Sequence, residues 1–342
     1  MNVATAFAVG DPSQVSEPRR AVQTLAARAG LSDEQIGRAA LVVSELATNL
    51  AKHARGGEML MRPLTSPSGE LDGVEVLALD KGPGIPDVAL SRRDGYSTTG
   101  TLGHGLGAIE RQADWFDLYT HPSGTAIAAR LWGTPPDRRR LPRMDVAAAH
   151  VAKSGEPICG DGWTWRMRDD RLAIFVADGL GHGMAAHDAA DAAVRVFEQY
   201  HEEAPARVVA DVHAAIRNTR GAAVAALAVD LARGVGRFAG VGNIGGTILL
   251  AAGGAHRMVS HPGTAGHTAG RIQEFTYPVP PGSIVVLFSD GLGTQWNLSA
   301  YPGIQGRSAS VIAGVLYRDY SRRRDDVTVV VAKDRPAVAE KL

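Results

Sequence analysis

The hydrophobic pattern of residues 1–133 predicts two helices followed by an antiparallel sheet. After a Ser-Asp-Glu-Gln run at residues 32–35, apolar residues recur every three or four positions until Gly56, which predicts a long amphipathic helix. Helices that precede a mostly hairpin-connected sheet predict an α+β sandwich rather than a doubly wound fold. The other expected elements are a helix over 17–29 and strands over 58–62, 74–79, 116–120 and 125–132.

The pattern from residue 145 onward predicts many short strands with a few long helices. Such a mixture is typical of a β-sandwich flanked by helices, so the fold class of the whole chain is α+β. Helices are expected over 184–200, 206–217 and 308–320, and strands over 146–152, 172–177, 223–229, 236–241, 247–251, 284–288 and 327–332.

A stretch rich in proline and arginine separates the two patterns. Residues 134–144 contain three prolines and four arginines and no apolar periodicity, which is typical of a linker. We therefore predict a first domain over residues 1–133, a second over 145–334 and a tail over 335–342.

Composition narrows the classes of function. The chain has 342 residues, 45% hydrophobic and 21% charged, which is ordinary for a soluble globular protein. Residues 1–133 carry 12 basic and 15 acidic side chains, and residues 145–342 carry 20 of each, so neither half is expected to bind nucleic acid. Cys159 is the only cysteine, which excludes an intramolecular disulfide and metal sites built on cysteine clusters. No membrane segment or leader pattern is evident, and a cytoplasmic location is expected.

Polar residues in the first half form three candidate ligand-binding elements. Glu45 and Asn49 are four residues apart on the long helix, where they could act as general base and Mg²⁺ ligand or simply form a solvated helix face. Asp80 ends an apolar strand and could accept a hydrogen bond from a ligand amine, with Gly82 and Gly84 letting backbone approach. A glycine-rich loop over 96–107 then leads into a helix, an arrangement suited to polyphosphate.

These elements, in this order and spacing, resemble the N, G1 and G2 boxes of the GHKL ATPase/kinase superfamily, which implies a Bergerat-type sandwich. Within it they look most like the anti-sigma-factor-type serine kinases of the RsbT kind. The resemblance implies that ATP binds with Mg²⁺ held by Asn49, that Asp80 contacts the adenine amine beside Thr125, and that Glu45 takes the proton from the attacking serine. Gly82 and Gly84 would shape the pocket. The phosphates would be covered by Gly103, His104, Gly105, Leu106 and Gly107. For His104 the alternative is a solvated loop histidine without a role in binding.

Acidic residues in the second half recur at strand ends or beside glycine. They are costly to cluster unless a cation neutralises them, and oxygen-only ligands favour Mg²⁺ or Mn²⁺ over zinc. Two such ions could activate a water for attack on a phosphoryl group, whereas a single Asp-Gly pair is usually an ordinary turn. The positions are Asp161, Asp178, Asp290 and the pair Asp325-Asp326.

The Asp-Gly-Leu-Gly-His-Gly, Ser-Asp-Gly and Asp-Asp-Val-Thr motifs at 178–183, 289–291 and 325–328 resemble the SpoIIE-like branch of the PPM serine/threonine phosphatases. A Val-Gly-Asn-Ile-Gly-Gly stretch at 241–246 looks RsbX-like. The resemblance implies a two-metal site in which Asp178 is the bridging, catalytic ligand together with the Gly179 carbonyl. Asp161, Asp290 and Asp325 would complete it, with Asp326 as the alternative to Asp325.

The two resemblances together imply a bacterial-type regulator that joins a serine-kinase-like module to a phosphatase. Such proteins act in partner switching, so the expected partner is a phosphoserine or phosphothreonine protein: a STAS-type antagonist or scaffold. An anti-sigma or sigma factor is a further candidate partner, and nucleic acid and membrane are not expected. One alternative is that the first module senses nucleotide or binds an anti-sigma partner without kinase turnover. Another is an interaction protein in which both sites are vestigial.

Overall fold

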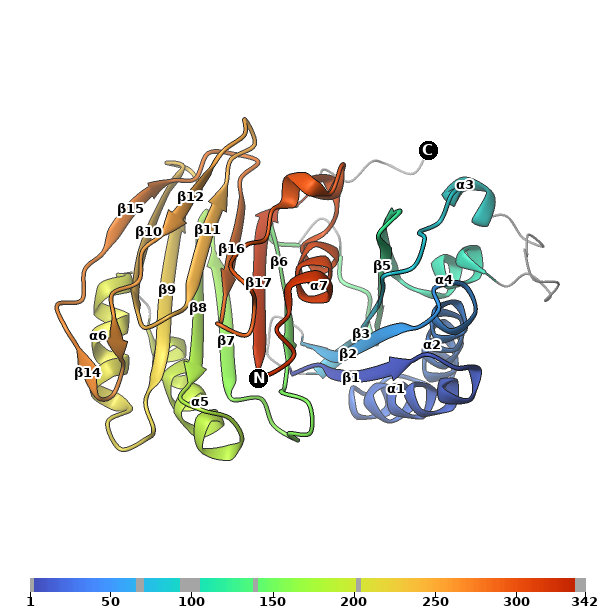
Figure 1. Cartoon of the computed structure of the whole chain (residues 1–342), viewed down its shortest axis with the longest axis horizontal. Coiled ribbons are helices and arrows are strands. Elements are labelled where there is room, and N and C mark those ends of the chain that lie inside the picture. The colour runs from blue at the N-terminus through green and yellow to red at the C-terminus, as the bar shows by residue number, and fades with distance from the viewer. Residues whose placement is uncertain (1–2, 66–70, 93–104, 138–140, 201–203, 336–342) are drawn as a thin grey trace. The chain divides into compact units, whose positions relative to one another are not determined.

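The computed structural model describes residues 3–65, 71–92, 105–137, 141–200 and 204–335. The chain forms two compact units (Figure 1). The N-terminal unit spans residues 2–141 and takes in Leu298–Arg307, and the C-terminal unit contains Pro142–Asn297 and the chain from Ser308 onward. Leu298–Arg307 thus lies in the range predicted for the second domain but packs in the first unit, an arrangement that hydrophobic periodicity cannot reveal.

The N-terminal unit is built on a five-stranded antiparallel sheet in the order β1-β2-β3-β5-β4. Four of these strands match predicted ranges within a few residues. The first strand was not predicted, because it is a short and largely exposed edge strand. The bounds are β1 Thr5–Val9, β2 Gly57–Thr65, β3 Leu71–Asp80, β4 Trp115–His121 and β5 Gly124–Trp132.

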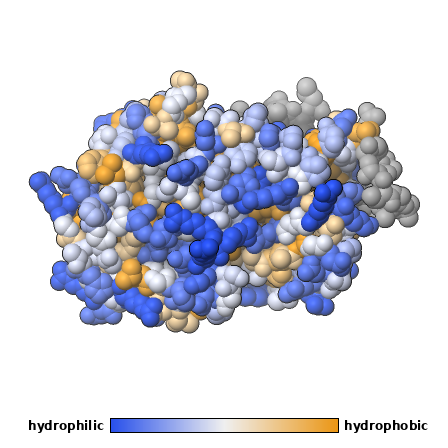
Figure 2. Space-filling view, in the orientation of Figure 1, coloured by the Kyte–Doolittle hydropathy of each residue, from blue (hydrophilic) through white to orange (hydrophobic). Residues whose placement is uncertain are grey.

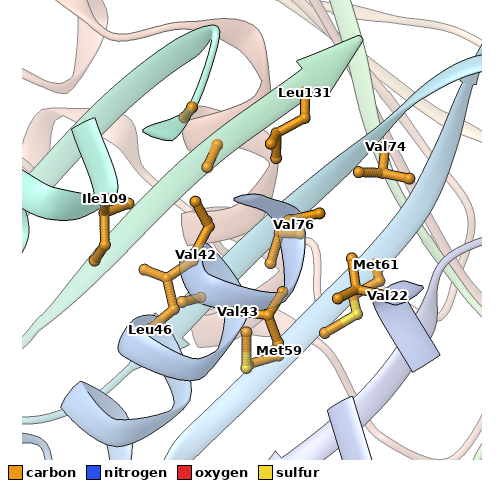
Figure 3. Close-up of a cluster of buried hydrophobic side chains, with 14 of the residues drawn as sticks. Val22, Val42, Val43, Leu46, Met59, Met61, Val74, Val76, Ile109 and Leu131 are labelled. Atoms are coloured by element: carbon orange, nitrogen blue, oxygen red, sulfur yellow. The ribbon is translucent and has the colours of Figure 1, made fainter. Parts of the chain in front are cut away.

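Helices of the N-terminal unit pack on one face of this sheet. The long helix α2 (Asp33–His53) begins at a capping box in which the Ser32 side chain accepts from the Gln35 amide. Its buried side chains Val42, Val43 and Leu46 lie against β2 and β3 and form the core shown in Figure 3. The shorter helices are η1 (Pro12–Val15), α1 (Ser16–Arg28), α3 (Val88–Ser91) and α4 (Leu106–Gln112).

The C-terminal unit contains two five-stranded antiparallel sheets, in the orders β15-β10-β9-β8-β7 and β12-β11-β16-β17-β6. We refer to them as the first sheet and the second sheet. The first comprises β7 (Asp161–Arg168), β8 (Arg171–Gly179), β9 (Ala222–Asp230), β10 (Val235–Val241) and β15 (Phe275–Pro278). The second comprises β6 (Met144–Val151), β11 (Gly245–Leu249), β12 (Ala255–Met258), β16 (Ile284–Phe288) and β17 (Val327–Asp334).

Apolar residues of both sheets meet in a common core that includes Ile174, Leu227, Phe238 and Val285. The other face of the first sheet packs against α5 (Met184–Gln199) and α6 (Pro205–Ala215), and α7 (Ala309–Tyr320) packs on β6 and β17. The expected α+β class, a sandwich of helices on a sheet followed by a β-sandwich flanked by helices, is therefore confirmed (Figure 1).

No helix among the described residues is long and apolar enough to cross a membrane. On the face shown in Figure 2, hydrophilic residues predominate and hydrophobic ones are scattered. Cys159 is buried, and burial raises the pKa of its thiol far above the ordinary value.

Candidate functional sites

The first candidate site begins on one face of α2. Glu45 and Asn49 are half-buried, while the apolar stripe that includes Val43, Leu46 and Leu50 is buried. The polar pair is therefore less buried than the apolar stripe of the same helix. The Asn49 side chain makes no hydrogen bond with any residue that the structure describes, so its amide oxygen remains available to a ligand.

Asp80 and Thr125 meet where β3 ends and β5 begins. Both residues are buried. One carboxylate oxygen of Asp80, Oδ1, accepts from the Gly82 amide at 2.8 Å and from the Thr125 amide at 3.1 Å. These two bonds fix the carboxylate relative to the turn that follows β3. The structure therefore brings together Asp80, Gly82 and Thr125, which are 45 residues apart at the extremes.

Two glycines of this site have no room for a side chain. Gly84 has φ +76°, and a Cβ there would lie 2.4 Å from the His121 carbonyl oxygen. A Cβ on Gly107 would lie 2.3 Å from the Arg92 carbonyl oxygen. Gly105 precedes α4, which begins at Leu106. Gly103 and His104 lie outside the described residues.

The second candidate site is an acidic cluster in the C-terminal unit, which comprises Asp161, Asp178, Asp290, Asp325 and Asp326. Asp161 on β7 and Asp178 on β8 are directly opposite each other in the strand register. Asp290 follows β16 by two residues, and the Asp325-Asp326 pair precedes β17. Gly179 is confined as well, because a Cβ there would lie 2.0 Å from the Ala186 carbonyl oxygen.

Burial and mutual repulsion disfavour negative charge in this cluster. Burial is the largest cause that raises the pKa of Asp161 to about 7; hydrogen bonds from Ser289 and Thr328 oppose it, and Asp326 and Asp290 add to it. Burial, followed by repulsion from Asp161 and the other acids, raises the pKa of Asp178 to about 9. The cluster therefore favours binding of a cation, which would restore the charged forms.

Asp290 differs from its neighbours in having cationic and amide partners. Burial and the nearby Asp325 raise its pKa, while Arg322 and a hydrogen bond from Asn243 lower it. The Asn243 side-chain amide donates to Asp290 Oδ2 at 2.8 Å. The sequence analysis noted the glycine-rich stretch that contains Asn243 but gave this residue no role. Its position in the loop after β10 was the only signal in the sequence that could have suggested one.

The two acids of the Asp-Asp pair have different surroundings. Asp326 is 4% exposed, and its Oδ1 accepts from the Lys153 amide at 2.9 Å. Its other oxygen is buried without a hydrogen-bond partner among the described residues and lies 2.7 Å from the position of a Cβ on Gly160. Asp325 is half-buried and close enough to raise the pKa of both Asp178 and Asp290. Asp326 in turn raises the pKa of Asp161 and Asp178, so both acids of the pair lie near the other acids of the cluster.

The donor set fits hard divalent ions. All candidate ligands are carboxylate or carbonyl oxygens, which suit Mg²⁺ and Mn²⁺. The described residues contain no group of three or more His, Cys, Asp or Glu side chains already arranged around one metal position.

Comparison with known proteins yields two family matches. Residues 8–131 match the family described as histidine kinase-like ATPase domain, and residues 168–334 match the family described as Stage II sporulation protein E (SpoIIE). The serine/threonine-protein kinase RsbT of Bacillus subtilis (strain 168) is 33% identical over 115 residues, which cover 33% of this chain and 85% of RsbT.

Two solved structures resemble the chain over 56% of its length. One comes from work on the bacterial stressosome, described as a modular system adapted to control secondary messenger signalling. It is 28% identical in sequence with a TM-score of 0.53, and the match covers 100% of its chain. The other is RsbX in complex with magnesium, 24% identical, with a TM-score of 0.52 and 96% of its chain covered. At that identity the likeness to RsbX concerns the fold alone.

Proposed function

We propose that this chain, which contains a histidine kinase-like ATPase domain related to RsbT and a SpoIIE domain, sets the phosphorylation state of a partner-switching protein. Its C-terminal unit would remove phosphate from serine or threonine with two Mn²⁺ or Mg²⁺ ions, and its N-terminal unit would bind ATP with Mg²⁺ and phosphorylate serine. The proposed partner is a STAS-type antagonist or scaffold, by analogy with RsbT and the stressosome protein.

The observation that carries the phosphatase proposal is the direct pairing of Asp161 and Asp178 at the ends of β7 and β8, beside three further acids. Asp161, Asp178, Asp290 and Asp325, with the Gly179 carbonyl, would hold the metal ions. When bound, two such ions would lower the pKa of a water and offset the negative charge of the phosphoryl group. The chain itself contributes oxygen donors, of which Asp161 and Gly179 are buried and the other three are half-buried.

The ATP proposal rests on three features of the N-terminal unit. Asp80 is fixed by the Gly82 and Thr125 amides, and Asn49 has no described hydrogen-bond partner on the polar face of α2. Glu45 shares that face and would serve as the general base toward the attacking serine. Positioning and the metal would supply most of the catalysis in such a transfer.

Hydrolysis of p-nitrophenyl phosphate with Mn²⁺ tests the phosphatase. We expect the wild type to be active and Asp178→Asn to lose at least about a hundredfold of that activity, with ATP binding unchanged. Asp188→Asn, the same change at an exposed position on α5, is the matched control and should keep full activity. An inactive wild type, or equal loss in both variants, would refute the assignment.

The kinase step is tested separately, with a purified STAS-domain protein and radiolabelled ATP. We expect label on a serine in the presence of wild type and Asp178→Asn, and none with Glu45→Gln, while all three bind ATP. If ATP binds but no protein is labelled, the N-terminal unit is a nucleotide sensor or binding module, as the alternative holds.

A further inference from the structure

Asp161 is held by a network of hydrogen bonds that connects the two sheets of the β-sandwich. Its Oδ2 accepts from Ser289 Oγ at 2.7 Å and from Thr328 Oγ1 at 2.7 Å. Asp161 lies on β7 of the first sheet, whereas Thr328 lies on β17 and Ser289 directly follows β16, both in the second sheet. Asp161 is 1% exposed and both hydroxyl residues are 0% exposed, so water does not compete for these bonds.

Each of the two hydroxyls has a second polar neighbour besides Asp161. With Asp161 ionised, Thr328 Oγ1 donates to its carboxylate, and His150 Nδ1 lies 2.8 Å from the same hydroxyl oxygen. Ser289 Oγ also gives its proton to Asp161 and accepts from the Thr328 amide at 2.9 Å. Each hydroxyl is therefore held between the Asp161 carboxylate and a second polar group, which restricts its orientation.

Both bonds end on the same oxygen of Asp161. No described residue hydrogen-bonds to the other oxygen, Oδ1, which is therefore left for a ligand. The two hydroxyls also belong to segments that carry other acids, since Ser289 precedes Asp290 and Thr328 follows the Asp325-Asp326 pair. The Ser289 amide donates to the Thr328 carbonyl at 3.0 Å, which joins these segments to each other.

From this geometry we propose that Ser289 and Thr328 are positioning residues: their hydroxyls fix the Asp161 carboxylate, and with it the spacing of three acid-bearing segments, for divalent metal binding. The inference rests on the proposed phosphatase function and deepens it. Partners that orient a ligand carboxylate commonly change metal affinity about 10- to 100-fold when removed.

The test measures Mn²⁺ affinity directly, by the electron paramagnetic resonance signal of free Mn²⁺, on the full chain. Thr328→Val keeps the shape and removes the hydroxyl, and we expect it to weaken Mn²⁺ binding at least about tenfold. Thr328→Ser restores the hydroxyl and should bind within about threefold of wild type. Thr247→Val removes a buried hydroxyl from β11 of the same sheet and should leave binding unchanged.

The outcomes separate positioning from simple structural support. If Thr328→Val lowers the melting temperature but binds Mn²⁺ like wild type, the hydroxyl is only structural and the proposal is overturned. If Thr328→Val does not fold, Ser289→Ala takes its place, with an expected weakening of about tenfold and the same refuting result. If the wild type binds Mn²⁺ and all variants bind it with the same affinity, only this inference is overturned. If the wild type binds no Mn²⁺, the proposed phosphatase function is overturned as well.

Discussion

Replacing Glu75 by Gln should selectively destabilise the N-terminal sheet. Glu75 on β3 is 1% exposed and lies between Arg62 on β2 and Arg130 on β5, its direct partners in the strand register. Arg62 Nε donates to Oε1 at 2.7 Å and Arg130 Nε donates to Oε2 at 2.5 Å. Glutamine keeps the size of the side chain but leaves two buried arginines without their shared anion.

The expected loss follows from the pKa of Glu75. Burial by itself would raise this pKa, but attraction and hydrogen bonds from Arg62 and Arg130 outweigh burial and lower it from 4.5 to about 2. That difference corresponds to about 3 kcal/mol of stabilisation at neutral pH. Breaking a buried ion pair by removing one partner typically costs about 3 to 5 kcal/mol, which agrees.

The pH dependence has a definite sign. Because the folded-state pKa lies below the ordinary value, the stabilisation is fully present above about pH 5 and is lost as the pH falls toward 2. The Gln variant has no such titration. Its N-terminal sheet should therefore show a smaller loss of stability on acidification than the wild type.

Hydrogen exchange measured by mass spectrometry reports the opening of the N-terminal unit separately from that of the C-terminal unit. At neutral pH the amides of β2, β3 and β5 should exchange roughly 100-fold faster in Glu75→Gln, with β8 and β9 of the C-terminal unit as internal reference. Glu110→Gln is the matched control, since Glu110 pairs with Arg92 at 3.0 Å but both side chains are more than 40% exposed. Acceleration of less than about threefold, or equal acceleration in the control, would refute the argument.

Two further predictions concern the C-terminal unit. Mn²⁺ at about 100 times its dissociation constant should stabilise this unit by about 2.7 kcal/mol, seen as a higher melting temperature by calorimetry; an Asp178→Asn variant that gains as much would contradict it. Gly179→Ala places a Cβ 2.0 Å from the Ala186 carbonyl oxygen, and should cost about 1 to 3 kcal/mol and reduce p-nitrophenyl phosphate hydrolysis. Gly270→Ala, where a Cβ meets nothing within 4 Å, should behave as wild type in both assays.

Elements with a strong apolar pattern could be predicted from the sequence, and these include the edge strands β4 and β6, whereas the edge strands β1, β7 and β12 were not predicted. The helix α2 and the strand β16 have continuous apolar patterns, and β16 matches its predicted range of residues 284–288. The strand β7 was missed because only its first three residues are buried and its sequence mixes aspartate, tryptophan and arginine. Short strands such as β12 were missed for the same reason, since tertiary pairing rather than local pattern defines them.

The candidate sites divide in a similar way. Acids beside glycine are visible as motifs, so Asp161, Asp178 and Asp290 could be predicted as candidates without the fold. The contacts that hold them were not, because Ser289 and Thr328 are common, uncharged residues whose role appears only when β16 and β17 pair. Long-range pairing also supplies the Thr125 amide that fixes Asp80.

Acidic side chains have opposite electrostatic environments in the two units. This contrast favours binding of a cation from solution in the C-terminal unit. Glu75 is neutralised by two arginines of the chain itself, which lower its pKa to about 2. Asp161 and Asp178 receive no arginine, and burial with mutual repulsion raises their pKa values to about 7 and about 9. Resident cations would have stabilised the acidic cluster as they stabilise Glu75. Divalent ions bound at this cluster, as the proposed phosphatase function requires, would supply that compensation.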